Sequence, residues 1–491
     1  MSVILALDLG TTGNRAIAFN KKGQALFSSY YEFKQHFPKP SWVEHDPIDI
    51  WRTTVQTIQD VITELGSQKI AAIGITNQRE TTVVWNKKTG KPVYNAIVWQ
   101  CRRTAQRCKE LQCIASSVRK KTGLFLDPYF SASKLEWILN HVSNLDGDLD
   151  KGNILFGTID SWILWNLTQG KIHATDPSNA SRTMLYNIHR HTYDSDLLQH
   201  FSIPRHILPQ VLPSSSFFGL TDKRLFNTEI PIHGLIGDQQ AALFSQCGAD
   251  YRRIKNTYGT GLFLMAATGT TCAPSTELIQ TVAWQLGENA IEYALEGSIF
   301  VGGSAIQWLR DELKLIHSAS DTAQLADSIS DTNGVYFVPA LTGLGAPYWD
   351  PDARGLFIGL TRGSNRTHLV RAVLESLAYQ TQDIINLMTE YSPQIKALRV
   401  DGGASKNSFL MHYQASVSQL VIEKPTLSET TALGAAGIAG ISSGFWTATE
   451  FHHCLELEKI YTPKPDAIMS AQKNYAIWKQ AVSRSLKWNS Y

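Results

Sequence analysis

The chain has 491 residues and carries 45 Lys and Arg against 43 Asp and Glu, so its net charge is only +2. A near-neutral chain without a long run of basic residues is not expected to bind nucleic acid through the phosphate backbone. Hydrophobic residues make up 43% of the sequence, which is enough to build large buried cores, and this length corresponds to roughly two to four domains.

Targeting and membrane segments are not expected from this sequence. Residues 1–9 contain no Lys or Arg ahead of their apolar run, unlike a secretory signal or a transit peptide. No stretch of about 18 apolar residues occurs, so we expect no membrane insertion. The six cysteines are sparse and contain no CxxC pair, which favours reduced thiols and a cytoplasmic protein.

The N-terminal region predicts strands joined by a loop rich in glycine and threonine. Residues 3–7 form a continuous apolar run, typical of a buried strand, and similar runs follow at 16–19 and 24–31. The loop Asp8-Leu-Gly-Thr-Thr-Gly-Asn-Arg15 therefore joins two strands. The Rossmann loop opens a helix instead, and no GxxxxGK[ST] sequence is present, so both of these nucleotide-binding motifs are excluded.

This loop has the composition of a phosphate-binding loop. Its glycines let backbone N–H groups approach a phosphate, and its threonine hydroxyls add hydrogen-bond donors. Arg15 can donate to a phosphate, and Asp8 at the strand end can hold Mg²⁺. An ordinary hairpin turn is the alternative, because the same residue types form turns. A second Gly/Thr loop at 256–261 again precedes an apolar strand, which favours phosphate binding.

Later segments alternate between predicted strands and predicted helices. Residues 70–75 and 235–237 are typical of strands, whereas Leu135, Ile138, Leu139 and Val142 have the spacing of an amphipathic helix. This alternation predicts an α/β fold. Because each half of the chain carries one Gly/Thr loop, we expect two similar domains, 1–247 and 248–491, with a cleft between them.

Three polar segments follow predicted strands, and each has two interpretations. Arg79 and Glu80 could bind substrate hydroxyls or form a surface ion pair. Asp238 could be a general base for a hydroxyl or the N-cap of a helix. The two glycines at 402–403 permit close approach of a nucleobase or a phosphate, but they also suit a tight turn.

Several longer motifs resemble those of the FGGY carbohydrate kinases, and the resemblance extends from Val3 to about Trp478. They include Asn-Gln-Arg-Glu at 77–80, Gly-Asp-Gln-Gln at 237–240 and Asn-Thr-Tyr-Gly-Thr-Gly at 256–261. Further matching segments lie at 95–103, 129–137, 338–350 and 359–363. A set of this length is not expected to recur by chance.

The resemblance implies two ribonuclease-H-like domains of the actin-like ATPase type that close over ATP and substrate. The implied reaction is ATP-dependent phosphorylation of glycerol to sn-glycerol 3-phosphate, with Mg²⁺ near Asp8 and Asp238 as the general base. The polyol would contact Arg79, Glu80, Trp99, Tyr129, Asp238, Gln239 and Phe263. The nucleotide would contact Thr11, Thr12, Gly13, Arg15, Thr260, Gly303, Gln307, Gly403 and Asn407. Members of the family are often dimers or tetramers, so a homo-oligomer is expected.

The first loop departs from the family pattern. Its glycerol-phosphorylating members usually have Asp-Gln-Gly-Thr-Thr-Ser-Ser-Arg, whereas this chain has Leu9 in place of Gln and Gly13-Asn14 in place of the two serines. The loop loses a hydroxyl but keeps its backbone donors, so we expect a shift in ATP affinity without loss of activity. The alternatives are a kinase of the same fold that acts on a pentulose or gluconate, and a non-catalytic actin-like protein that binds ATP.

Overall fold

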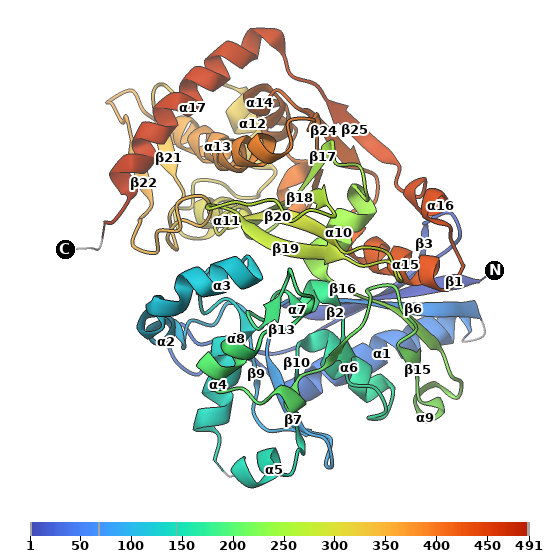
Figure 1. The fold of residues 1–491 in the computed structure, drawn as a ribbon. Coiled ribbons are helices and arrows are strands. Elements are labelled where there is room, and N and C mark those ends of the chain that lie inside the picture. Colours follow the sequence, from blue (N-terminus) through green and yellow to red (C-terminus); the bar gives the residue numbers. More distant parts are fainter. Residues whose placement is uncertain (1, 67–68, 144, 489–491) are drawn as a thin grey trace.

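The computed structural model describes residues 2–66, 69–143 and 145–488. The outer ends of the two predicted domains, Met1 and 489–491, lie outside the described residues. Two bodies are stacked on one another in Figure 1, and each is built around one large β-sheet. Helices α10 (Asp238–Gln246) and α15 (Thr430–Ser442) lie between the two bodies.

The first sheet has the strand order β15-β16-β6-β1-β2-β3. Strands β1, β2 and β3 form an antiparallel meander, whereas β6 and β16 run parallel to β1. The segments that predicted strands at 3–7, 16–19, 24–31, 70–75 and 235–237 all contribute to this sheet, although β3, which contains most of 24–31, is largely exposed. Its strands are β1 (Val3–Leu9), β2 (Gly13–Phe19), β3 (Ala25–Glu32), β6 (Ile70–Asn77), β15 (Gly219–Leu220) and β16 (Pro231–Gly237).

The second sheet has the strand order β19-β20-β18-β17-β23-β24-β25. Strands β17, β18, β20 and β19 are joined in antiparallel pairs, whereas β23 and β24 continue parallel to β17. Its strands are β17 (Arg253–Tyr258), β18 (Leu262–Gly269), β19 (Ile279–Trp284), β20 (Glu292–Ile299), β23 (Ala397–Asp401), β24 (Val421–Pro425) and β25 (Leu457–Tyr461).

The two sheets repeat one topology. The order β3-β2-β1-β6-β16 matches β20-β18-β17-β23-β24, with three antiparallel strands followed by two strands parallel to the first. The similarity of the two halves that the Gly/Thr loops predicted is therefore confirmed at the level of strand order. In both halves the Gly/Thr loop connects the first two strands of the meander.

Helices cover both sheets, and local signals explain several of their boundaries. Asp46 caps α1 by accepting a hydrogen bond from the backbone N–H of Ile48, and Pro47 opens the helix. The predicted amphipathic helix is α4, in which Leu135 and Ile138 are buried, and it ends at His141. The longer helices are α1 (Pro47–Leu65), α4 (Ser131–His141), α6 (Ile159–Leu167), α11 (Gly303–Asp311), α13 (Arg366–Tyr391), α14 (Ser408–Ser418) and α17 (Pro465–Ser485).

The remaining α-helices and strands are short, and most of them belong to the first half. The helices are α2 (Ala105–Glu110), α3 (Ala115–Thr122), α5 (Asp146–Asp150), α7 (Pro177–Ala180), α8 (Ser195–His200), α9 (Lys223–Phe226), α12 (Asp321–Asp327) and α16 (Ala448–His452). The strands are β4 (Gln35–His36), β5 (Glu44–His45), β7 (Val83–Asn86), β8 (Lys91–Pro92), β9 (Ala96–Ile97), β10 (Ile154–Gly157), β11 (Ala174–Thr175), β12 (Tyr186–Asn187), β13 (Thr192–Tyr193), β14 (Gln210–Val211), β21 (Tyr336–Val338) and β22 (Leu356–Ile358).

Helix α15 connects the two halves, because it belongs to the second half in sequence and packs on the first sheet. It contacts β1, β6 and β16 and also lies along α10. Its small residues allow this close packing: a side chain at Gly434 would collide with the backbone of Ala241 on α10. The core around α15 therefore mixes residues of both halves, including Ile4, Met265 and Ile438.

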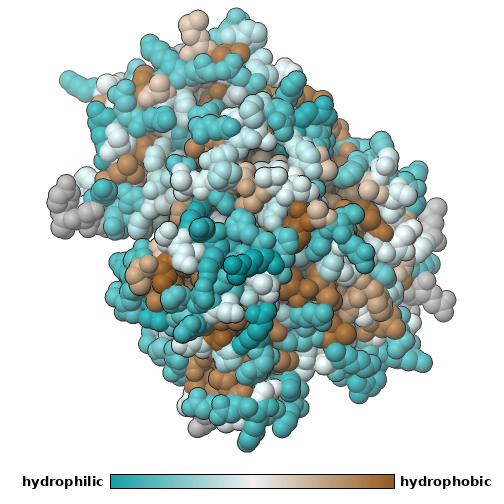
Figure 2. All heavy atoms as spheres, in the orientation of Figure 1, coloured by the Kyte–Doolittle hydropathy of each residue, from teal (hydrophilic) through white to brown (hydrophobic). Residues whose placement is uncertain are grey.

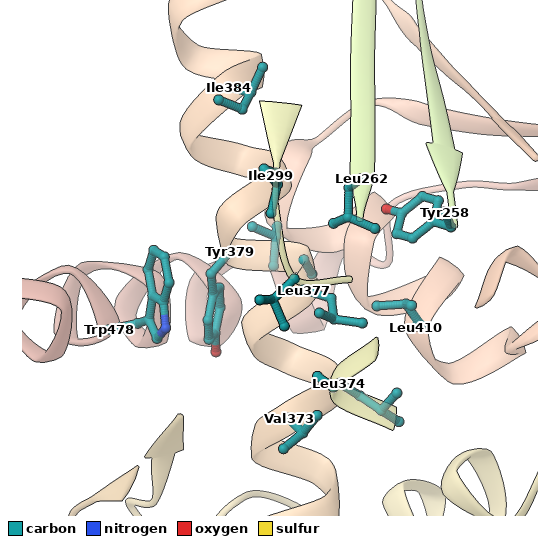
Figure 3. Close-up of a cluster of buried hydrophobic side chains, with 14 of the residues drawn as sticks. Tyr258, Leu262, Ile299, Val373, Leu374, Leu377, Tyr379, Ile384, Leu410 and Trp478 are labelled. Atoms are coloured by element: carbon teal, nitrogen blue, oxygen red, sulfur yellow. The ribbon is translucent and has the colours of Figure 1, made fainter. Parts of the chain in front are cut away.

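The second half also has its own core, between its sheet and helices α13, α14 and α17. In Figure 3, Leu374, Leu377 and Tyr379 project from α13, with Trp478 of α17 beside Tyr379. On the face shown in Figure 2, hydrophilic side chains cover most of the surface, and apolar ones are interspersed among them. Within the described residues, no helix is long and apolar enough to span a membrane.

Candidate active site

Three of the predicted site residues lie at one edge of the first sheet. Strands β1, β6 and β16 are parallel neighbours, and the register pairs both Leu9 and Gly237 with Asn77. Their carboxyl ends therefore meet. Asp8 is the last residue but one of β1, Arg79 follows β6, and Asp238 directly follows β16. Because ligands of open α/β sheets bind outside the carboxyl ends of the strands, this edge is the candidate site.

Asp238 is the first residue of α10 and remains partly exposed at this edge. Its Oδ1 atom lies 3.1 Å from Nε of Arg79 and accepts the backbone N–H of Gln239 at 2.7 Å. The N-cap residue is Gly237, so the N-cap interpretation of Asp238 is wrong. Burial raises the pKa of the Asp238 carboxyl, and the charge of Arg79 opposes this change. A carboxylate of this kind is suited to accept a proton from a hydroxyl.

Arg79 and Glu80 belong to a buried network of charges. Arg79 donates two hydrogen bonds to Glu296 on β20, at 2.7 and 3.1 Å. Arg182 donates to Glu80 at 2.6 Å and to Glu296 at 3.1 Å. Arg79 and Glu80 are only 3% and 1% exposed, so the interpretation as a surface ion pair is wrong. Glu80 also has a φ of 61°, an uncommon backbone conformation that tends to occur at functional sites.

The aromatic residues predicted to pack against the polyol are half-buried around this network. Trp99 donates its indole N–H to the Thr11 hydroxyl at 3.1 Å and meets Tyr129 edge to face, with ring centroids 5.6 Å apart. The ring of Tyr129 lies 5.6 Å from the guanidinium of Arg182. Phe263 is the second residue of β18, in the other half of the chain. The ammonium group of Lys255 donates to both the Phe263 carbonyl and the Gln239 side chain, and so connects them. The predicted polyol residues therefore converge from both halves.

The first Gly/Thr loop lies between β1 and β2. Its turn closes through the backbone N–H of Gly10 and the carbonyl of Gly13, at 3.0 Å, and Thr12 is exposed. A Cβ atom at Gly13 would lie 2.5 Å from the carbonyl oxygen of Tyr31 and 2.7 Å from the Tyr30 hydroxyl. The glycine that replaces the family's usual serine is therefore explained by β3 lying close to the loop.

Two further polar residues of this loop, Asn14 and Arg15, have partners of their own. Asn14 is buried and donates to the hydroxyls of Thr53 and Thr54, so it anchors β2 to α1 and does not face a ligand. Arg15 is paired with Glu429, which precedes α15, and its guanidinium lies over the Tyr30 ring. A nucleotide phosphate would have to compete with Glu429 for Arg15.

Asp8 lies in an electronegative position. Burial and the nearby carboxylates of Asp238 and Glu429 raise its pKa to about 7, whereas Arg15 acts in the opposite direction. Within the residues that the structure describes, no three His, Cys, Asp or Glu side chains are close enough to form a metal cage. This arrangement suits a hard cation that keeps most of its waters and binds one or two carboxylates together with substrate phosphates, as Mg²⁺ does.

The predicted nucleotide residues of the second half gather at the carboxyl ends of β17 and β23, which are parallel neighbours. The backbone of Gly303, at the start of α11, donates to the Gly259 carbonyl at 2.8 Å, and Gly302 donates to that of Thr260. Gln307 is exposed on α11. Gly403 has open space where a side chain would be, and Asn407 caps α14.

Sequence reasoning missed four residues of this site, namely Lys255, Arg182, Glu296 and Glu429. The first three are fully buried charges that contact predicted site residues. Glu296 is flanked by Ala294, Leu295 and Gly297 on β20, and Arg182 lies in a segment of small polar residues. For Glu296 and Arg182, a single charge in a locally uncharged segment was the signal that could have identified them, because such charges are rarely buried without a specific partner. Lys255 has no such signal, since Arg252 and Arg253 lie beside it.

Comparisons with known proteins identify the family. The model of the FGGY carbohydrate kinase N-terminal domain matches residues 3–245, and that of the C-terminal domain matches 254–443. A glycerol kinase of Pseudothermotoga lettingae is 53% identical over 99% of this chain and 98% of its own length. Glycerol kinase 2 of Thermotoga maritima is 51% identical over 99% of each chain.

Comparison with solved structures supports the same family. The structure of Plasmodium falciparum glycerol kinase with ADP has a TM-score of 0.92 and 35% identity, covering 99% of this chain and 98% of its own. A xylulose kinase of Lactobacillus acidophilus, 21% identical, has the same fold with a TM-score of 0.90 over 99% of this chain and 98% of its own. The predicted fold of two ribonuclease-H-like, actin-like domains is confirmed. The chain belongs to the FGGY family of carbohydrate kinases.

Proposed function

We propose that this protein transfers the γ-phosphoryl group of ATP to glycerol, giving sn-glycerol 3-phosphate and ADP. The observation that carries the proposal is the convergence of Asp238, Arg79 and Glu80 at the carboxyl ends of β16 and β6, with Asp238 only 3.1 Å from Arg79. Relatives that are about 50% identical over nearly their whole length are glycerol kinases, which supports glycerol as the substrate.

In this proposal Asp238 accepts the proton of the attacking hydroxyl. The neighbouring Arg79 favours the ionised form of this carboxyl, so Asp238 is available as a base. Because phosphoryl transfer passes through a loose transition state, a carboxylate is a sufficient base and positioning matters most. Arg79, Glu80, Gln239 and Tyr129 would hold the hydroxyls, and Trp99 and Phe263 would pack against the carbon atoms.

The nucleotide would lie between the two Gly/Thr loops. Thr11, Thr12, Gly13 and Arg15 would contact the phosphates, and Thr260, Gly303, Gln307, Gly403 and Asn407 would contact the nucleotide from the second half. Asp8 would hold Mg²⁺, and the excess of carboxylates around it fits a cation. When bound, Mg²⁺ neutralises charge that develops on the phosphate oxygens.

The test is an assay of ADP release with Mg-ATP and a panel of glycerol, dihydroxyacetone, D-xylulose, L-ribulose and gluconate. We expect turnover on glycerol. Asp238→Asn should retain ATP binding and lower kcat by about 10² or more, the range for loss of a general base. A fall of less than threefold would show that Asp238 only orients the substrate.

The panel also distinguishes the alternatives. Turnover on a pentulose or on gluconate, without turnover on glycerol, would leave the fold and the nucleotide site in place but refute the polyol pocket. ATP binding without turnover on any substrate would favour the non-catalytic binding protein. The division into domains 1–247 and 248–491, the cytoplasmic location and the homo-oligomer remain predictions; the family models support the division by ending and restarting at 245 and 254.

A further inference from the structure

Lys255 on β17 is a fully buried lysine beside the proposed polyol site. Its Nζ atom donates to Oε1 of Gln239, to the Thr257 hydroxyl at 2.9 Å and to the Phe263 carbonyl at 3.2 Å. Among the ion pairs formed by the described residues, none includes Lys255. A buried ammonium group without a paired carboxylate is costly, so its position calls for an explanation.

The secondary structure determines where this ammonium group lies. Lys255 and Thr257 are two residues apart on β17, so their side chains project from the same face of the sheet. Residue Thr257 is in register with Phe263 of β18, and α10 packs against both strands. The three acceptors of Lys255 therefore come from three elements, and two of them belong to predicted polyol residues, Gln239 and Phe263.

The ammonium group also dictates which way the Gln239 amide faces. A lysine ammonium has three donors and no acceptor, so it requires the amide oxygen, not the amide nitrogen. The NH₂ group of Gln239 is then left to donate elsewhere. Without Lys255 the amide could turn over and exchange its donor and acceptor ends. Burial lowers the pKa of Lys255 to about 8, while the carboxylates of Asp401 and Asp238 favour its charged form.

We propose that Lys255 is a positioning residue of this kinase, which fixes the amide of Gln239 so that its NH₂ group donates to a hydroxyl of the polyol. The proposal rests on the proposed function. Lys255 touches neither substrate in this role; it acts through Gln239. Its loss should therefore weaken the binding of glycerol while leaving the binding of ATP unchanged.

The test compares KM values in a double-mutant cycle. Lys255→Met removes the ammonium group and retains much of the side-chain volume, and we expect KM for glycerol to rise at least tenfold with KM for ATP within twofold. Gln239→Ala should give a similar rise. In the Gln239→Ala background, Lys255→Met should add less than twofold, because the group it positions is already absent.

Two further variants make the test specific. Gln239→Glu keeps an oxygen for Lys255 but has no NH₂ group, so its KM for glycerol should rise as much as that of Gln239→Ala. This variant leaves Lys255 in place and tests the proposal even if Lys255→Met does not fold. The matched control is Lys424→Met, on β24 of the same sheet, where the lysine pairs with Glu458; its KM values should stay within twofold.

The outcomes separate this inference from the proposed function. Wild-type protein that does not phosphorylate glycerol would refute the proposed function and, with it, this role. An active wild type in which Gln239→Glu keeps its KM for glycerol would overturn the role of Lys255 alone. The role of Lys255 would also be overturned if Lys255→Met raised KM for glycerol by the same factor in the wild-type and Gln239→Ala backgrounds.

Discussion

Single residues at the carboxyl edge of the first sheet have environments that set their protonation. The pKa of Asp8 is raised to about 7, because it is desolvated and faces the carboxylates of Asp238 and Glu429. A raised pKa means that the folded state binds the proton more tightly than the unfolded state. Without metal or nucleotide, Asp8 therefore reduces the free energy of unfolding as the pH rises from about 4 to about 7.

The first prediction uses Asp8→Asn, which removes this titration. In buffer without metal ions or nucleotide, the variant and the wild type should be equally stable near pH 4. The variant should become more stable than the wild type by on the order of 2 kcal/mol above pH 7, after allowing for solvent screening of a partly exposed group. Urea unfolding across this pH range measures the difference, and a constant difference would contradict the raised pKa.

Gly13 replaces the serine that is usual in the family, and the closeness of β3 explains this difference. Restoring the usual residue by Gly13→Ser should cost about 1–3 kcal/mol of stability, because the new side chain would overlap Tyr31 and Tyr30. The matched control is Gly403→Ala in the other half, where no atom lies within 4 Å of the added Cβ atom. Its stability should stay within about 0.5 kcal/mol of the wild type. Equal effects in thermal unfolding would refute the steric explanation.

At the level of elements, β20 supplies a buried charge that connects the two halves. Glu296 accepts hydrogen bonds from Arg79 and Arg182, both of the first half, and these arginines hold its pKa at about 2. Helix α15 makes a second connection through packing, since its small residues lie against β6 and α10. The junction thus includes both a buried ionic network and a closely packed helix.

The third prediction concerns this network. Glu296→Gln should lower the free energy of unfolding by about 3–5 kcal/mol at pH 7, because it leaves two buried arginines with too little negative charge. Since the wild-type pKa is depressed, the deficit should be constant above about pH 4.5 and shrink as the pH falls toward 2. The control is Glu292→Gln on the same strand, where the carboxylate contacts Tyr251 outside the network, and it should change stability little.

At the scale of the whole molecule, the proposed ligand contacts are divided between the two halves. The phosphate loop belongs to the first sheet, whereas the loops at 259–261 and 402–403 belong to the second. A ligand that touches both is expected to draw the halves together, as in other proteins whose domains close around a ligand.

The fourth prediction follows from this division. Small-angle X-ray scattering should show a smaller radius of gyration with glycerol and a non-hydrolysable ATP analogue together than in the free protein. Glycerol alone is the control and should give a smaller change, because it lacks the phosphates that reach the first Gly/Thr loop. An unchanged radius with both ligands at saturation would rule out closure.

The sequence by itself determined the features that depend on local order. Apolar runs predicted β1, β2, β6 and β16, because a strand buried on both faces is continuously apolar. The run that predicted β3 is less continuous, and that strand is largely exposed. The first Gly/Thr loop and Asp238 were identifiable because each directly follows such a run, and the second Gly/Thr loop was identifiable because it precedes one. Four residues, namely Tyr129, Gly303, Gln307 and Asn407, were assigned by resemblance alone, since nothing in their neighbourhood distinguishes them.

Only the tertiary structure decided which charges meet. Arg182 is 102 residues from Glu80, and Glu296 is 217 residues from Arg79. Lys255 is 16 residues from Gln239 but lies on a different element. No local pattern in the sequence shows which of these residues will meet. Only the tertiary structure also showed that Asn14 contacts α1, and that α15, which belongs to the second half in sequence, packs on the first sheet. The physical reason is that a buried charge is stable only beside an oppositely charged or polar partner, and a helix of small residues only against a closely packed neighbour. The packing of the whole chain determines which partners and neighbours are present.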